Sequence, residues 1–125
     1  AYSPLGRGML TGRFRAEKLS KGDWRSTTPR FQGEAYATNV ALADEIEAVA
    51  SAKSCAPAQI ALAWVIGRGE HIMALTGTTK LENLKVNLGA CDVQLSHNER
   101  MTLDALAARV IGDRYDKWGM AGING

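Results

Sequence analysis

Apolar residues recur at helical spacing in the segment from about Asn39 to Lys53. Leu42, Ile46 and Val49 follow one another at intervals that place them on one face of an α-helix. Acidic residues occupy the other face of this segment and its first half, where the dipole of a helix favours negative charge: Asp44, Glu45 and Glu47. The pattern therefore predicts an amphipathic helix over about residues 39–53.

A second helix is expected to begin at Pro57, because the missing N–H of proline would have no intrahelical partner at the first helical position. Residues 59–66 are apolar on nearly every side, which is typical of a helix buried between other layers. Glycines 67 and 69 end this helix. The next apolar run, residues 72–75, is short and continuous, as in a strand buried on both faces of a parallel sheet. A helix followed by such a strand is typical of the α/β fold class.

Two further helices are expected in the C-terminal half. A helix begins near Lys80, with Leu81, Leu84 and Leu88 on one face. Ser96 and Glu99 have the spacing of a capping box. In this motif a serine and a glutamate three residues later each accept a hydrogen bond from the other's backbone N–H. It opens a helix whose inward face carries three apolar residues: Leu103, Leu106 and Val110. The last dozen residues are rich in glycine and are expected to form an irregular tail.

Composition describes an ordinary globular chain of modest size. The 125 residues are 46% hydrophobic and 22% charged, with a formal net charge of +2, which excludes disordered and fibrous classes. The first 30 residues carry most of the positive charge: Arg7, Arg13, Arg15, Lys18, Lys21, Arg25 and Arg30, against Glu17 and Asp23. Such a segment indicates an anionic partner, and a solvated arginine-rich loop is the alternative. Nucleic acid is not expected as that partner, because no stacking aromatics are interleaved with the basic residues.

The cysteines and the apolar runs point to a reducing, aqueous environment. Cys55 and Cys91 stand far apart with no partner at metal-ligand spacing, so we expect reduced thiols and no metal site. No apolar run reaches the roughly 18 to 20 residues of a membrane span, and no signal peptide is visible. A cytoplasmic protein without a membrane partner is expected. The chain begins at Ala1 inside an apolar-to-turn transition, and we interpret it as a piece of a longer protein.

Two segments carry features that suit phosphate binding. Gly77, Thr78, Thr79 and Lys80 stand at the predicted start of a helix, where unpaired N–H groups and a partial positive charge attract anions. Simple N-capping by one of the two threonines is the alternative interpretation. The second segment, residues 2–8, reads YSPLGRG: a strand end that runs into a glycine-punctuated turn with a hydroxyl, free amides and an arginine.

Taken together, these motifs resemble the cofactor-binding stretches of the aldo-keto reductase family, in its pyridoxal-reductase-like and auxin-induced-protein-like branch. YSPLGRG with LTG at residues 10–12 resembles the loop after the seventh barrel strand, and PAQIALAWV at residues 57–65 resembles the helix before strand eight. GTTKLENL at residues 77–84, NLGA at 87–90 and GDRY at 112–115 complete a resemblance that spans essentially the whole chain.

The resemblance implies the C-terminal portion of a TIM (β/α)8 barrel: strands seven and eight, their helices and a C-terminal extension. Residues 1–125 would form one partial barrel domain. Within it, the expected parts are a cofactor loop (1–34), helices (35–69), a strand with a phosphate-binding helix start (70–90), and a C-terminal helix with a tail (91–125).

The resemblance also implies NADP(H) as the cofactor and assigns roles to single residues. Tyr2 would stack on the nicotinamide. The pyrophosphate would be lined by Ser3, Leu5 and Arg7. The adenosine 2′-phosphate would be surrounded by Thr79, Lys80 and Asn83, in a cofactor-binding segment that also includes Gly77 and Thr78. Asn87 would meet the edge of the adenine.

No catalytic residue is expected in this chain. Family catalysis uses an Asp, a Tyr, a Lys and a His carried by earlier strands, and that motif set is absent from this sequence. His71 and His97 are candidates only by residue type, and their positions favour structural roles. The resemblance therefore implies the cofactor-binding part of an NADPH-dependent reductase whose complete form takes a small-molecule carbonyl substrate. The alternative is a non-catalytic, stand-alone module that binds a partner or undergoes self-association through open strand edges.

Overall fold

The computed structural model describes residues 1–14 and 19–123. Arg15, Glu17 and Lys18 of the basic leading segment, and Gly125 of the tail, lie outside these residues. Five α-helices follow one another in the described part: α1 (Gly33–Ala52), α2 (Pro57–Ile66), α3 (Leu81–Leu88), α4 (His97–Ala108) and α5 (Lys117–Ala121). Short 3-10 turns precede α1, namely η1 (Gly6–Thr11), η3 (Trp24–Thr27) and η4 (Pro29–Phe31), and η5 (Gly89–Asp92) lies between α3 and α4.

Helix α1 begins six residues before the predicted start, at Gly33, and ends at Ala52. Leu42 and Ile46 are buried as the apolar spacing predicts, whereas Asp44 and Glu45 are exposed on the opposite face. The early start has a tertiary cause, because η4 packs against the first turns of α1 and buries Phe31 in a small cluster with Met9, Phe14 and Ala43. The spacing of apolar residues could not predict this early start, because the packing of η4 on α1 is a tertiary contact.

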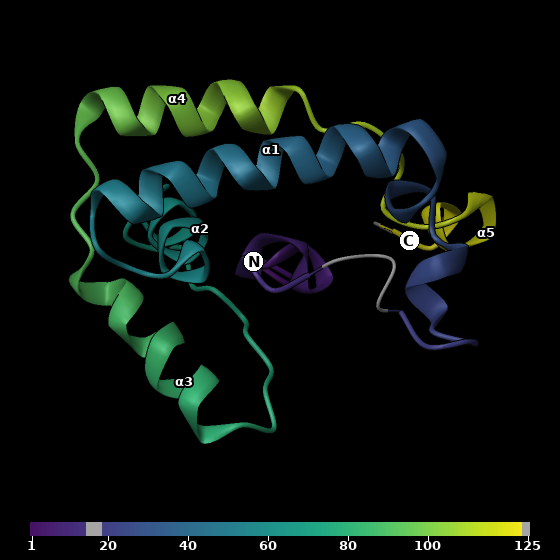
Figure 1. Cartoon of the computed structure of the whole chain (residues 1–125), viewed down its shortest axis with the longest axis horizontal. Coiled ribbons are helices and arrows are strands. Elements are labelled where there is room, and N and C mark those ends of the chain that lie inside the picture. Colours follow the sequence, from purple (N-terminus) through teal and green to yellow (C-terminus); the bar gives the residue numbers. More distant parts are fainter. Residues whose placement is uncertain (15–18, 124–125) are drawn as a thin grey trace.

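The main core lies between α1, α2 and α4. In Figure 1, α4 runs along α1, and the N-terminal segment lies on the other side of α1. Helix α2 occupies its predicted bounds, and its Ile60 is completely buried. Leu103 and Leu106 of α4 complete the core, as predicted. Val110 does not, because α4 ends at Ala108 and leaves this side chain 41% exposed.

Local signals predicted the start of α4 correctly and misjudged the tail. The Ser96 hydroxyl accepts a hydrogen bond of 3.2 Å from the N–H of Glu99, and the Ser96 N–H donates one of 2.7 Å to the Glu99 carboxylate. This is the predicted capping box. The tail is not wholly irregular: Asp116 accepts a hydrogen bond of 2.8 Å from the N–H of Gly119 and starts the short helix α5. An aspartate cap is enough to order one turn there.

The predicted strand over residues 72–75 is reduced to a single parallel bridge between Tyr2 and Leu75. The N–H of Leu75 donates a hydrogen bond of 2.8 Å to the carbonyl of Ala1. Burial on both faces is wrong for this segment, since Met73 is 80% and Leu75 71% exposed. The side chains suit a buried strand, but no described element covers them. Of the expected parallel sheet, the described residues therefore contain only the pairing of Tyr2 with Leu75.

Helix α3 begins directly after Lys80, where the sequence placed it. Its three leucines lie on one face, yet Leu81 is 66%, Leu84 43% and Leu88 63% exposed. No single described helix is long and apolar enough to cross a membrane. Helices α1 and α2 reach that length and composition only as a pair bent by 94°, and both bury their apolar residues in the core described above.

Candidate functional site

The turn after Tyr2 owes its shape to left-handed backbone at several positions. Ser3 has φ of 53° and Arg7 has φ of 59°, conformations that residues with a Cβ adopt at a cost of about 1 kcal/mol or more. Hydrogen bonds of 3.0 Å from the N–H of Gly6 to Ser3 and from the N–H of Gly8 to Leu5 close the turn. Strained backbone held by its surroundings is a common property of ligand-binding loops.

The Arg7 guanidinium group lies against two aromatic rings. Its guanidinium carbon lies 4.7 Å from the centre of the Trp24 ring and 4.4 Å from that of Tyr115. The Arg7 carbonyl accepts a hydrogen bond of 3.2 Å from Arg25. The Nη1 of Arg7 is buried and has no hydrogen-bond partner among the described residues. A fixed cation with an unused donor is poised for an anionic ligand.

Tyr2 is 44% exposed and lies under the guanidinium of Arg114, whose carbon is 4.9 Å from the ring centre. Hydrogen bonds from Arg114 and Tyr115 hold the pKa of Tyr2 below its ordinary value, and the charges of Arg114 and Arg7 act in the same direction. The tyrosine is therefore surrounded by cations, and its ring is partly open to a flat partner.

The segment before α3 forms a small polar network. The Thr78 hydroxyl accepts a hydrogen bond of 3.2 Å from the N–H of Lys80 and one of 3.4 Å from the Asn83 amide. Lys80 is the N-cap of α3, and no side chain caps the helix. Capping by a threonine hydroxyl, the alternative weighed above, is therefore wrong. The first N–H groups of α3 are left for water or an anion.

Arg13, which follows the YSPLGRG segment within the expected cofactor loop (1–34), contacts helix α3, which follows the segment 77–80. Its Nη1 donates a hydrogen bond of 3.4 Å to the Oδ1 of Asn83. Gly77, Thr78, Thr79 and Lys80 are exposed beside this contact, while Asn83 and Asn87 are half-buried on α3. Arg7 lies in η1, and Leu5 is the residue directly before it. Both belong to the N-terminal loop that also carries Arg13.

A mainly apolar cavity of about 530 Å³ opens beside the N-terminal segment. Among the residues predicted to bind the cofactor, Tyr2 and Ser3 line it. Its walls come from α1, α2 and α4, and it also carries the side chains of Arg30 and Arg114. A volume of this size accommodates a small organic molecule.

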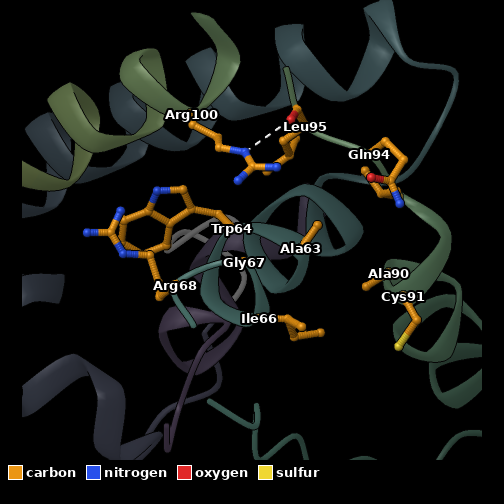
Figure 2. Close-up of a pocket in the computed structure, with 11 residues that line it drawn as sticks. Ala63, Trp64, Ile66, Gly67, Arg68, Ala90, Cys91, Gln94, Leu95 and Arg100 are labelled. Atoms are coloured by element: carbon orange, nitrogen blue, oxygen red, sulfur yellow. Dashed lines mark hydrogen bonds between the residues drawn. The ribbon is translucent and has the colours of Figure 1, made fainter. Parts of the chain in front are cut away.

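A second cavity of about 190 Å³ lies between α2 and the segment from Ala90 to Leu95 (Figure 2). Figure 2 shows Arg100 turned to the carbonyl of Leu95, to which its Nε donates a hydrogen bond of 3.1 Å. No residue predicted to bind the cofactor lines this cavity, so it is not the candidate site. The described residues also contain no cluster of His, Cys, Asp or Glu that could hold a metal ion.

Several residues at the site were not assigned roles by sequence: Arg13, Trp24, Arg30, Arg114 and Tyr115. Arg13 and Arg30 belong to the basic leading segment, whose charge was the available signal. Arg114 and Tyr115 reach the site only because the tail returns to it. The Nε of Arg30 donates a hydrogen bond of 2.9 Å to the carbonyl of Gly112, and this bond holds the tail in place.

Comparison with known proteins decides the family. The model of the aldo/keto reductase family matches residues 1–108. The chain belongs to the aldo/keto reductase family. It is 38% identical over 117 residues to the aldo-keto reductase yakc of Schizosaccharomyces pombe, whose name includes NADP(+). The match covers 91% of this chain and 34% of that protein.

A solved structure supports the same assignment. The chain superposes on a glycerol dehydrogenase from Gluconobacter oxydans with a TM-score of 0.74 at 29% sequence identity. The superposition covers 94% of this chain and 36% of the dehydrogenase. This aldo/keto reductase chain thus spans about a third of the length of the relatives it matches. The arrangement of its helices matches that of the solved dehydrogenase, even though the described residues form only one parallel bridge.

Proposed function

We propose that this chain is the C-terminal portion of an NADP(H)-dependent aldo-keto reductase barrel and supplies most of the cofactor site. Its Tyr2 and Leu75 segments would be strands seven and eight of that barrel, and residues 1–125 one partial domain. The complete protein would reduce a small aldehyde or ketone to an alcohol in the cytoplasm, without a nucleic-acid or membrane partner. Family membership and the NADP(+) of the yeast relative's name support the cofactor.

The hydrogen bond between Arg13 and Asn83 carries this proposal, because it connects the expected cofactor loop (1–34) to helix α3, and these two parts would bind opposite ends of one cofactor. Tyr2 would stack on the nicotinamide, and Ser3, Leu5 and Arg7 would line the pyrophosphate. The exposed segment from Gly77 to Lys80, with Asn83, would hold the 2′-phosphate, and Asn87 the adenine. The uncapped start of α3 adds N–H groups and a favourable dipole for that phosphate.

The cofactor supplies the hydride when it is bound, and the residues of this chain position it. Proton donation to the carbonyl would come from groups outside this sequence, since no residue here has the context of the family's catalytic set. We therefore expect the isolated chain to bind NADPH without catalysing reduction. Carbonyl-dependent NADPH oxidation by the chain alone would contradict this expectation.

The binding proposal is tested by titrating the chain with NADPH and with NADH. We expect NADPH to bind about tenfold or more tightly than NADH, because only NADPH carries the 2′-phosphate that Lys80 would contact. Lys80→Ala should remove this preference. Lys85→Ala is the matched control, because it deletes the same charge from an exposed position on the same helix and should leave the preference intact. Equal affinity for both cofactors in the unmodified chain would refute the assignment.

Exposed Met73 and Leu75 favour a second candidate, a non-catalytic module that associates with itself through this open edge. Such a chain would sediment as a dimer or larger species at micromolar concentration. A monomer across that range would exclude self-association and leave the reductase proposal untouched.

A further inference from the structure

The tail that follows α4 folds back onto the segment that would bind the cofactor. Arg114 covers the ring of Tyr2, with its guanidinium carbon 4.9 Å from the ring centre. The next residue, Tyr115, lies against Arg7, whose guanidinium carbon is 4.4 Å from the centre of the tyrosine ring. Tyr2 and Arg7 are the residues proposed above to stack on the nicotinamide and to line the pyrophosphate. Two neighbouring tail residues thus occupy the contact surfaces of two cofactor-binding residues. We call residues 113–123 the lid.

The chain is anchored directly before the lid begins. The Asn39 side chain donates a hydrogen bond of 2.9 Å to the carbonyl of Ile111 and accepts one of 3.2 Å from its N–H. The Nε of Arg30 donates a hydrogen bond of 2.9 Å to the carbonyl of Gly112. Gly112 has a left-handed backbone with φ of 85°, which glycine adopts without a steric cost. The lid therefore starts from a fixed point and a backbone position that can pivot.

Beyond this anchor the chain is lightly packed. None of residues 113–123, all of which the structure describes, is buried, and Trp118 of α5 is 88% exposed. Arg114 and Tyr115 are half-buried, and a contact between a cation and a ring is weak where water reaches it. In Figure 1, α5 lies at the end of the molecule away from α2 and α3. A segment with so few buried apolar contacts opens at a low cost in free energy.

The closed lid obstructs full engagement of the cofactor. The Nη1 of Arg7 is buried and unpartnered among the described residues, so an oxygen of the pyrophosphate could reach this donor only after a neighbouring group moves. The ring of Tyr115 is such a neighbour. The guanidinium of Arg114 occupies ring surface of Tyr2 on which a nicotinamide would stack. Opening the lid would free both residues at once and would let the buried donor find an acceptor.

We infer that residues 113–123 form a lid that pivots at Gly112 and, when closed, restricts access of the nicotinamide half of the cofactor to Tyr2 and Arg7. This inference rests on the proposed reductase function, which supplies the cofactor roles of those two residues, and it adds a regulatory element to their site. Only the open lid admits the nicotinamide half, so the apparent affinity falls with the fraction of open molecules. The adenine half would bind at α3, away from the lid (Figure 1).

Two ligands that share the adenine half test the lid by calorimetric titration: NADPH, and adenosine 2′,5′-bisphosphate, which has no nicotinamide. Arg114→Ala should bind NADPH about threefold to fivefold more tightly than the unmodified chain, because a contact that holds the lid closed is lost. The variant should bind the bisphosphate within about 1.5-fold of the unmodified chain. Arg109→Ala is the control, because it removes an equal charge from an exposed pair with Glu45. It should change neither affinity by more than about 1.5-fold.

A tighter complex after the loss of a cation is the decisive sign, since removing a positive charge alone would weaken the binding of an anionic ligand. Tyr115→Leu removes the contact with Arg7 and should also tighten NADPH binding. Either variant decides the question if circular dichroism shows that it folds.

The possible results separate the lid from the proposed function. NADPH affinity that stays the same or falls in a folded variant, while the bisphosphate still binds, would overturn the lid and leave the proposed function standing. Equal gains for both ligands would also overturn the lid, because the site at α3 lies outside its reach. An unmodified chain that binds neither ligand would refute the proposed function and the lid with it.

Discussion

The Nη1 of Arg13 donates a hydrogen bond of 3.4 Å to the Oδ1 of Asn83, 70 residues further along the chain. Arg13 is exposed and the distance is long, so we expect the bond to contribute only about 0.5 kcal/mol to folding stability. A contact this weak can open to admit a cofactor and close after it. The Asn83 amide also donates to Thr78, which links the contact to the start of α3.

Asn83→Ala should therefore impair ligand binding far more than folding. We expect NADPH affinity to fall by about tenfold, because a polar contact to the phosphate-binding segment is lost. The midpoint of urea unfolding should hardly change. Asn98→Ala, an exposed asparagine on α4, is the control and should leave both quantities unchanged. Unaltered NADPH affinity in Asn83→Ala would argue against the assigned cofactor position.

Asn39 connects the tail to the core and is the most deeply buried polar side chain described for α1. It is 3% exposed, donates a hydrogen bond of 2.9 Å to the carbonyl of Ile111 and accepts one of 3.2 Å from its N–H. Asn39→Ala should destabilise the chain by about 1 to 3 kcal/mol, since it leaves part-buried backbone groups of Ile111 unpaired. Urea denaturation measures this loss. A change below about 0.5 kcal/mol would show that the tail is not held through Asn39.

Gly12 combines a left-handed backbone with a crowded site. Its φ is 71°, and a Cβ added there would lie 2.9 Å from the Cγ of Pro57 in α2. Gly22 has φ of 89° and nothing within 4 Å, so it isolates the backbone contribution. We expect Gly22→Ala to cost about 1 kcal/mol and Gly12→Ala about 1 to 3 kcal/mol more, as measured by thermal unfolding. Equal losses would mean that η1 shifts freely away from α2.

The ionisation of Asp23 makes the folding stability of the chain depend on pH. Hydrogen bonds from the Arg25 side chain and backbone lower its pKa to about 2, against about 3.9 in an unfolded chain. Because the folded pKa is the lower one, the pair stabilises the fold above about pH 4, and this contribution is lost as the pH falls toward 2.

The test compares unmodified chain with Asp23→Asn across that range. The difference in melting temperature should be constant from pH 7 to about pH 5 and should shrink steadily toward pH 2. Arg25→Gln should raise the pKa of Asp23 toward its ordinary value, which carbon NMR of the carboxyl can follow. A pKa of Asp23 that stays the same in Arg25→Gln would assign the acid dependence to other carboxylates.

Sequence patterns succeeded where a short stretch of chain decides the outcome. Pro57 and Gly67 delimit α2, and Ser96 with Glu99 starts α4, because proline geometry, glycine and capping bonds act within one helical turn. The start of α1 was missed because η4 supports it from outside the helix. The strand at residues 72–75 has the side chains of a buried element, yet no described part of the chain covers it.

The sequence by itself determined the family resemblance, the helix faces and the two segments that would bind the cofactor. The contact between the N-terminal loop and α3 was decided by the tertiary structure, which brings Arg13 to Asn83. The same is true of Arg7 and Arg30, which the returning tail contacts through Tyr115 and Gly112. The physical reason is that apolar periodicity and capping act over a few residues, whereas charges far apart in sequence become neighbours only when packing of α1, α2 and α4 fixes the path of the chain between them.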